Sequence, residues 1–142
     1  MLHDAKDTTK QCPCGSGKPF NFCCEPAING NKPATTAEAL MRSRYTAFAL
    51  GSVDYLIATT AAENRQPEDA PIIAEQMRMT TWTGLKIISS HNGGREDNIG
   101  TVEFIAYFDS EGQSAALQER SRFRQEQNRW YYIDGDVEIR RS

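Results

Sequence analysis

The sequence predicts an α+β fold, with three helices packed on one face of a curved four-stranded antiparallel sheet and a small metal-binding module ahead of them. Two patterns predict the main domain. Apolar residues recur with helical spacing between residues 36 and 80, and from Trp82 onward they alternate with polar residues as in a strand. Helices followed by strands are typical of an α+β domain. All four cysteines precede both patterns.

The cysteines lie in the segment CPCGSGKPFNFCC, where the Cys-x-Cys pair Cys12 and Cys14 precedes the Cys-Cys pair Cys23 and Cys24. Four thiolates suffice for a closed, tetrahedral zinc site. The spacing within each pair is shorter than the usual Cys-x₂₋₄-Cys of zinc sites, and the Cys-x-x-Cys spacing of redox proteins is absent. Spacing therefore favours a metal site but leaves disulfide and redox alternatives open.

A linker rich in Asn, Gly and Pro, residues 27–33, separates the cysteine module from the main domain. The predicted division is therefore residues 1–33 for the tail, metal motif and linker, and residues 34–142 for the main domain.

Three helices are expected at the start of the main domain. The first begins in the capping-box sequence of residues 35–38 and ends before Gly51, with Arg44 on its apolar stripe and Arg42 facing water. The second runs from Ser52 to about residue 60. The third runs from about residue 69 to residue 80, with inward residues Ile72, Ile73, Gln76 and Met77.

Four strands are expected after the helices, at residues 82–91, 101–108, 116–127 and 129–137. A turn-rich break, HNGGREDN, separates the first two, and Gln127-Asn128-Arg129 forms a short hairpin connection between the last two.

The run from Cys12 to Lys18, followed by Phe22-Cys23-Cys24, closely resembles the SEC-C motif. That motif is the small zinc-binding tail of the SecA translocation ATPase and is attached to many other proteins. The resemblance implies that Cys12, Cys14, Cys23 and Cys24 together bind one zinc ion. Four protein ligands leave no open coordination position, so we expect the ion to stabilise the fold and not to act in catalysis.

Five further segments resemble the YchJ-like family, bacterial proteins with an N-terminal SEC-C motif and an NTF2-like domain. They are LMRSRY (40–45), GSVDYL (51–56), TVEF (101–104), ERSRF (119–123) and WYYIDG (130–135). The resemblance covers residues 12–137 and implies an NTF2-like cone for the main domain. Two departures stand out: Gln118 replaces a His of many relatives, and no second SEC-C motif follows. One metal ion is therefore expected, not two.

Two charged residues lie on faces that are otherwise apolar. Arg44 is on the stripe of the first helix, and Glu119 shares one face of the third strand with Leu117, Ser121 and Phe123. Because a lone buried charge is costly, we predict that Arg44 and Glu119 approach each other, with Ser121 joining them. The pair either holds the helix to the sheet or forms the polar floor of a pocket inside the cone.

Such a pocket would have aromatic walls, as small-molecule sites often do. The candidate wall residues are Tyr45, Tyr55, Trp82, Phe104, Trp130 and Tyr132. No catalytic residue is identified. His91 falls at a strand end, His3 falls in the tail, and an arginine partner would weaken Glu119 as a base.

The net charge of −3 and the pI near 5.4 argue against a general nucleic-acid binder, and Arg120, Arg122 and Arg124 are expected to form a solvated strand face. The sequence has no signal peptide and no run of 18 apolar residues. We therefore expect a cytoplasmic protein, whose thiols stay reduced, without a membrane role.

The expected function is that of a non-enzymatic zinc protein that binds a protein partner through an exposed patch near Lys18, Phe20 and Phe22. One alternative is a small-molecule binder or enzyme that uses the cone, which requires an open cavity of at least about 300 Å³. Another is ribosome or nucleic-acid binding through the zinc module. A homodimer formed through the open face of the sheet is also left open.

Overall fold

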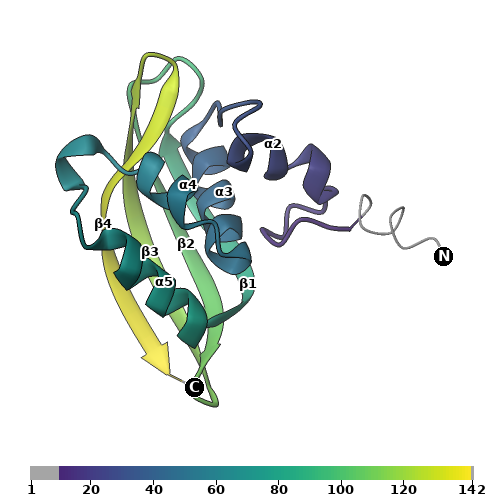
Figure 1. Ribbon diagram of the computed structural model, residues 1–142. Helices are drawn as coiled ribbons and strands as arrows, with labels where there is room; N and C mark the ends of the chain where they lie inside the picture. Colours follow the sequence, from purple (N-terminus) through teal and green to yellow (C-terminus); the bar gives the residue numbers. More distant parts are fainter. Residues whose placement is uncertain (1–9, 142) are drawn as a thin grey trace.

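The computed structural model describes residues 10–141 and has the predicted α+β architecture. The four strands form one antiparallel sheet in the order β1-β2-β3-β4, and helices α3, α4 and α5 lie on the same face of it (Figure 1). The elements in chain order are the 3₁₀ helix η1 (Phe20–Phe22), α2 (Glu25–Ile28), α3 (Ala37–Leu50), α4 (Val53–Ala58), the 3₁₀ helix η2 (Ala62–Asn64), α5 (Asp69–Met79), β1 (Thr81–Asn92), β2 (Ile99–Ser110), β3 (Gln113–Glu126) and β4 (Arg129–Arg141).

Helix α3 begins one residue later than its capping-box sequence predicts. Thr36 is the N-cap, and its hydroxyl accepts a hydrogen bond from the Ala39 amide at 3.0 Å. Glu38 does not reach back to the cap but instead pairs with Arg42 one turn later. The helix ends at Gly51 as predicted. Gly51 has a φ of +86°, a left-handed backbone conformation that residues other than glycine rarely adopt.

Helix α5 covers the sheet less completely than its sequence pattern predicts. Ile73 and Met77 are half-buried and Gln76 faces the space beneath the helix, but Ile72 is 50% exposed, so one of the four predicted inward positions is wrong. None of the residues of this helix is fully buried. The helix therefore lies over the sheet without sealing it, which leaves space between them.

The last two strands meet in a two-residue hairpin, in which Gln127 and Asn128 have φ values of 51° and 67°. A β-bulge follows, because Phe123 pairs with Tyr132 whereas Arg122 pairs with Asp134. Because of the bulge, the residues of β4 that face the helices have even numbers before it, such as Tyr132, and odd numbers after it, such as Gly135.

The cysteine module packs directly on the main domain. Cys12, Cys14 and Cys24 are buried in the same hydrophobic core as Leu40 and Met41 of α3. The first two residues of the expected linker belong to helix α2, and the chain turns only after them. The predicted domain boundary between residues 33 and 34 stays a prediction.

No helix within residues 10–141 combines the length and the apolar character that crossing a membrane requires.

Candidate metal centre and neighbouring cavity

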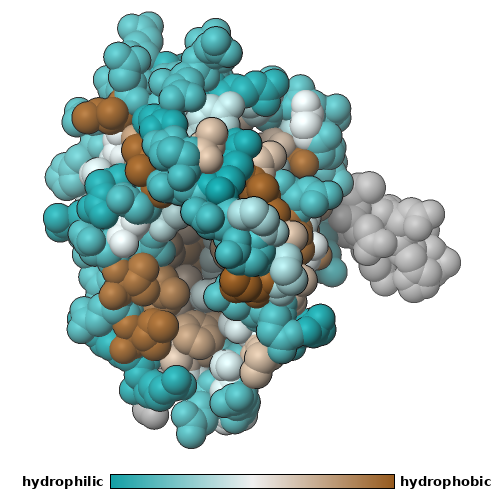
Figure 2. Space-filling view, turned by 60° about the vertical axis from the view of Figure 1, so that its left-hand side comes forward, coloured by the Kyte–Doolittle hydropathy of each residue, from teal (hydrophilic) through white to brown (hydrophobic). Residues whose placement is uncertain are grey.

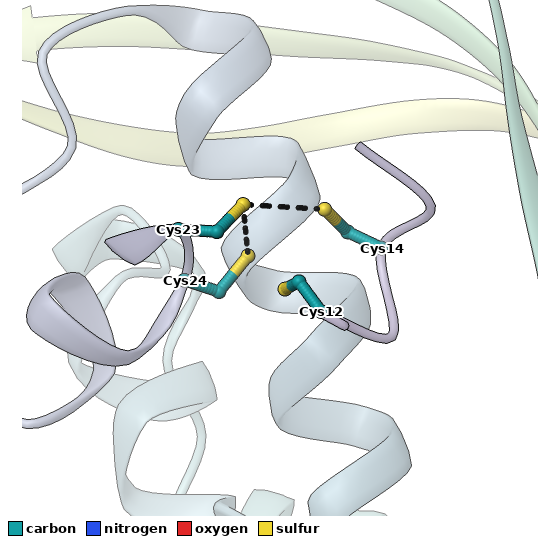
Figure 3. Close-up of side chains that lie close together, drawn as sticks. All are labelled: Cys12, Cys14, Cys23 and Cys24. Atoms are coloured by element: carbon teal, nitrogen blue, oxygen red, sulfur yellow. Dashed lines mark hydrogen bonds between the residues drawn. The ribbon is translucent and has the colours of Figure 1, made fainter. Parts of the chain in front are cut away.

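The four cysteines come together as the spacing predicts. Their sulfur atoms all lie within 4.8 Å of one another and point toward a common centre (Figure 3). The Sγ of Cys23 is 3.6 Å from that of Cys14 and 4.0 Å from that of Cys24. These separations exclude a disulfide, whose S–S bond is about 2.05 Å long, and all four thiols are free.

The same separations fit a tetrahedral metal ion. With metal–sulfur bonds of about 2.3 Å, the sulfurs of a tetrahedral zinc site would be about 3.8 Å apart. A backbone hydrogen bond from the Cys12 amide to the Lys18 carbonyl, 2.9 Å long, closes the loop that presents the first pair. The cluster is therefore able to hold a metal ion with four sulfur ligands.

Helix α3 supports this cluster through two residues that sequence reasoning did not identify. The Thr46 hydroxyl, fully buried, donates to the Cys24 sulfur at 3.3 Å and lies 3.7 Å from the Cys12 sulfur. Arg42 does not simply face water, because its guanidinium donates to the Cys14 carbonyl at 3.0 Å and approaches the Cys14 sulfur at 3.7 Å. The signal in the sequence was their spacing, since polar residues four apart share a helix face.

Hydrogen bonds within the cluster separate the acidities of its thiols. Contacts from Cys12 and Cys24 hold the pKa of the Cys14 thiol far below its usual range, whereas the contacts with Cys12 and Cys14 raise the pKa of Cys24. Burial raises the pKa of the Cys23 thiol. Because metal ligands must be thiolates, metal binding at this site would release protons.

A cavity of about 400 Å³ lies between the helices and the inner face of the sheet. In Figure 2, apolar side chains gather beside a hollow in the surface. Four of the six predicted wall residues line it, namely Tyr45, Trp82, Phe104 and Tyr132, and so do the three predicted polar residues Arg44, Glu119 and Ser121. The other residues that line it are Met41, Phe48, Gln76, Thr80, Ala106, Phe108, Leu117, Phe123 and Ile139.

Arg44, Glu119 and Ser121 line the same cavity, so the predicted approach is found, but Arg44 and Glu119 do not form a direct ion pair. Among the residues that the structure describes, no ion pair joins the two side chains. Tyr132 stands between them: its hydroxyl donates to Glu119 Oε2 at 2.7 Å, and the Arg44 guanidinium carbon lies 4.6 Å from the centre of its ring. The connection from helix to sheet is thus a hydrogen bond and a cation–π contact in series.

Arg44 finds its hydrogen-bond partners at the end of helix α4. One of its nitrogens donates to the Leu56 carbonyl at 2.9 Å and to the Thr59 hydroxyl at 2.6 Å. Burial lowers the pKa of Arg44 to about 10, so the side chain remains charged at neutral pH. Burial raises the pKa of Tyr132, and the negative charge of Glu119 raises it further. The Tyr132 hydroxyl therefore stays protonated and can donate a hydrogen bond.

Two predicted wall residues, Trp130 and Tyr55, lie elsewhere. Trp130 is 2% exposed and donates to the Thr35 carbonyl at 3.2 Å, so it fastens the start of α3 to β4. The Tyr55 hydroxyl bonds to Ser43 at 2.6 Å, on a different side of α3 from the cavity. His91 is exposed at the end of β1, and His3 is outside the described residues.

The arginine stripe on the outer face of β3 is neutralised by acidic neighbours, in keeping with the expected solvated face. Arg120 lies 3.5 Å from Glu103, and Arg124 bonds to Glu63 at 2.5 and 2.7 Å. The bond from Arg124 lowers the pKa of Glu63 to about 2. Arg122 is held between two aspartates, Asp134 and Asp136. Paired in this way, the stripe offers little free charge to a phosphate backbone.

Comparisons with known proteins agree with this architecture. Residues 36–135 match the family model described as the middle, NTF2-like domain of YchJ. A UPF0225 protein of Serratia proteamaculans is 44% identical over 126 residues, which cover 87% of this chain and 81% of the relative. The UPF0225 protein GSU1048 of Geobacter sulfurreducens is 41% identical over 127 residues, which cover 89% and 79% of the two chains.

Two solved structures are also similar. The solution structure of RPA3114, a SEC-C motif containing protein of Rhodopseudomonas palustris, has a TM-score of 0.81 and 39% identity, and the match covers 89% of this chain and 97% of that one. The crystal structure of a SEC-C motif containing protein of Psychrobacter arcticus has a TM-score of 0.74 and 27% identity, with coverage of 90% and 82%.

Proposed function

The chain belongs to the YchJ-like family of UPF0225 proteins, and from that premise we propose that it is a zinc-stabilised binding protein whose NTF2-like cavity holds a small, mainly apolar ligand. The observation that carries the proposal is the open cavity of about 400 Å³. It exceeds the volume of about 300 Å³ at which ligand pockets begin.

The lining of the cavity supports binding of a small molecule. Its walls are mostly aromatic and aliphatic, while Arg44, Glu119, Ser121 and Tyr132 bring polar groups together at one region of its surface. Apolar walls supply affinity by burying ligand surface, and a few convergent polar groups fix the orientation of the ligand. No residue of helix α5 is fully buried, and its residue Gln76 lines the cavity.

A cavity-filling substitution tests the proposal. The neutral fluorescent probe N-phenyl-1-naphthylamine is expected to bind the protein with one-to-one stoichiometry, measured by fluorescence titration. Ala106 lines the cavity and is 2% exposed, so Ala106→Phe places a ring in the space that the probe needs. We expect this change to weaken binding at least about tenfold, a loss of about 1.4 kcal/mol.

Ala49→Phe is the matched control, because Ala49 is exposed on helix α3 and does not line the cavity. Leu117→Phe is a second filling variant in case Ala106→Phe does not fold, which circular dichroism would reveal. Probe binding that survives both filling variants would place the probe elsewhere and contradict the proposal.

The metal in this proposal is one structural zinc ion held by Cys12, Cys14, Cys23 and Cys24. The all-sulfur ligand set and the sulfur separations of 3.6 and 4.0 Å support zinc. Free thiols in all four positions suit a reducing compartment, so we place the protein in the cytoplasm.

A second candidate function, docking of a protein partner on the cysteine module, is favoured by Phe22. Its side chain is 75% exposed at the border of an open groove. Lys18, Lys32 and Arg95 also border this groove, which suits an acidic segment with an apolar residue. Phe20, by contrast, is half-buried against the core.

Photo-crosslinking tests this second candidate. A photoreactive residue in place of Phe22 is expected to form a discrete cross-link to one protein in cells, whereas the same residue in place of exposed Glu96 is not. Equal cross-linking from both positions would argue that the Phe22 surface has no dedicated partner, and a cross-link to RNA would favour the ribosome alternative.

A further inference from the structure

The carboxylate of Glu119 lies in the cavity with unused hydrogen-bonding capacity. One oxygen, Oε2, accepts the 2.7 Å hydrogen bond from Tyr132. Across residues 10–141 we find no other hydrogen bond to this carboxylate and no cation within ion-pair distance of it. An ionised carboxylate can accept about four hydrogen bonds, so most of its capacity is available to a ligand.

The backbone of β4 is shaped to hold this carboxylate. A Cβ atom added to Gly135 would collide with Glu119 Oε2 and would lie 2.8 Å from its Cδ atom. The β-bulge described above allows Tyr132 and Gly135, three residues apart, to contact the same carboxylate. A bulge and a glycine together therefore create the place in which the Glu119 side chain lies.

The nearby positive charge of Arg44 does not satisfy Glu119. The Arg44 guanidinium donates to Leu56, Thr59 and Thr60 and stacks over the Tyr132 ring, which separates it from the carboxylate. A carboxylate bordered by apolar walls is costly without a partner of opposite charge. A cationic ligand in the cavity would supply that partner.

Aromatic rings form another part of the cavity wall, four residue pairs along the strands from Glu119. Trp82 packs against Phe108 with ring centres 5.1 Å apart and against Tyr45 at 6.0 Å, and all three rings line the cavity. These rings offer apolar surface to the rest of a ligand whose charged end lies at Glu119.

We propose that the cavity selects an organic ammonium ligand, a protonated amine that carries an apolar group. Its N–H groups donate to the free oxygen of Glu119, and its apolar part packs against Trp82 and the neighbouring rings. This inference rests on the proposed function, because it names the class of ligand that the same cavity takes.

Three probes of nearly one shape test the selection: 1-naphthylmethylamine, 1-naphthalenemethanol and 1-naphthoate. They carry an ammonium, a neutral hydroxyl and a carboxylate on the same ring system. Isothermal titration calorimetry on the metal-loaded protein is expected to give a dissociation constant at least about tenfold lower for the amine than for the other two. Glu119→Gln, which keeps the size of the side chain, is expected to abolish this preference.

Glu103→Gln is the matched control, since Glu103 lies on β2 and bonds to Gln118 and Arg120 outside the cavity. It is expected to leave the preference unchanged. Gly135→Ala, which displaces the Glu119 carboxylate, is expected to weaken binding of the amine more than binding of the alcohol.

The outcomes distinguish failure of the ammonium inference from failure of the proposed function, which is ligand binding in the cavity. If the alcohol or the carboxylate binds as tightly as the amine, or if Glu119→Gln keeps the preference for the amine, the ammonium inference is overturned while the cavity proposal stands. If none of the three probes binds, and N-phenyl-1-naphthylamine does not bind either, both are overturned.

Discussion

Replacing Cys14 with serine is expected to abolish stoichiometric metal binding. Cys14 is fully buried, and its sulfur lies 3.6 Å from that of Cys23 at the centre of the cluster. The free energy of zinc binding at structural sites is about 10–16 kcal/mol. Shared among four ligands, this is about 3–4 kcal/mol for each, so loss of one ligand should lower the affinity roughly a hundredfold to a thousandfold. Metal content per chain, measured after dialysis against a competing chelator, checks this expectation.

Ser16→Ala is the control for the metal prediction. The Ser16 hydroxyl lies 3.1 Å from the Cys23 sulfur but is not a ligand, so this variant should keep one ion per chain. A Cys14→Ser protein that retains the ion with unchanged affinity would contradict the four-sulfur site.

Chelation of the wild-type protein should also loosen helix α3. Its residues Leu40 and Met41 share a core with three of the cysteines, whereas β2 and β3 are held by strand pairing along their whole length. Hydrogen exchange at amides 40–46 should therefore accelerate more than exchange at amides 102–106. Uniform acceleration would mean that the metal controls global unfolding instead.

Phe123→Ala is expected to lower the free energy of unfolding by about 3–5 kcal/mol. Phe123 is 1% exposed on β3, and its ring packs edge-on against that of Tyr132, with centres 5.8 Å apart. Its removal would enlarge the cavity and release Tyr132 from its position. Urea denaturation monitored by circular dichroism measures the change.

Val137→Ala provides the comparison for Phe123→Ala. Val137 is on the next strand and 53% exposed, so its truncation should change the free energy of unfolding by no more than about 0.5 kcal/mol. If Phe123→Ala lowers the free energy of unfolding by less than about 1 kcal/mol, the neighbouring side chains repack into the space of the lost ring, and this part of the cavity wall is not rigid.

The sequence was sufficient to predict the order of helices and strands and the clustering of the cysteines. Strand periodicity correctly put Glu119, Ser121 and Phe123 on the inner face of β3, since successive side chains alternate between faces. Periodicity did not reveal how far apart two inward residues lie. The insertion of Tyr132 between Arg44 and Glu119 depends on three-dimensional packing, and the bulge beside Tyr132 has no clear sign in the sequence.

The errors on helix α3 have a related cause. A single apolar stripe was expected, with Arg42 in water, but the helix is buried on two sides, by the sheet and by the cysteine module. The linker pattern predicts a separate module, which leaves Arg42 and Thr46 without a partner. The capping box predicts Thr35 as the N-cap, but Thr36 is an equally good capping residue and takes that position.

Helix α3 is a wall shared by the metal cluster and the cavity, with Arg42 and Thr46 on one side and Arg44 and Tyr45 on the other. The two sites share a structural element through which they can be coupled. If zinc binding repositions this helix and so changes the affinity of the cavity by some factor, an occupied cavity must change the affinity for zinc by the same factor. Titrations of the ligand and of the metal would then be two measurements of one coupling free energy.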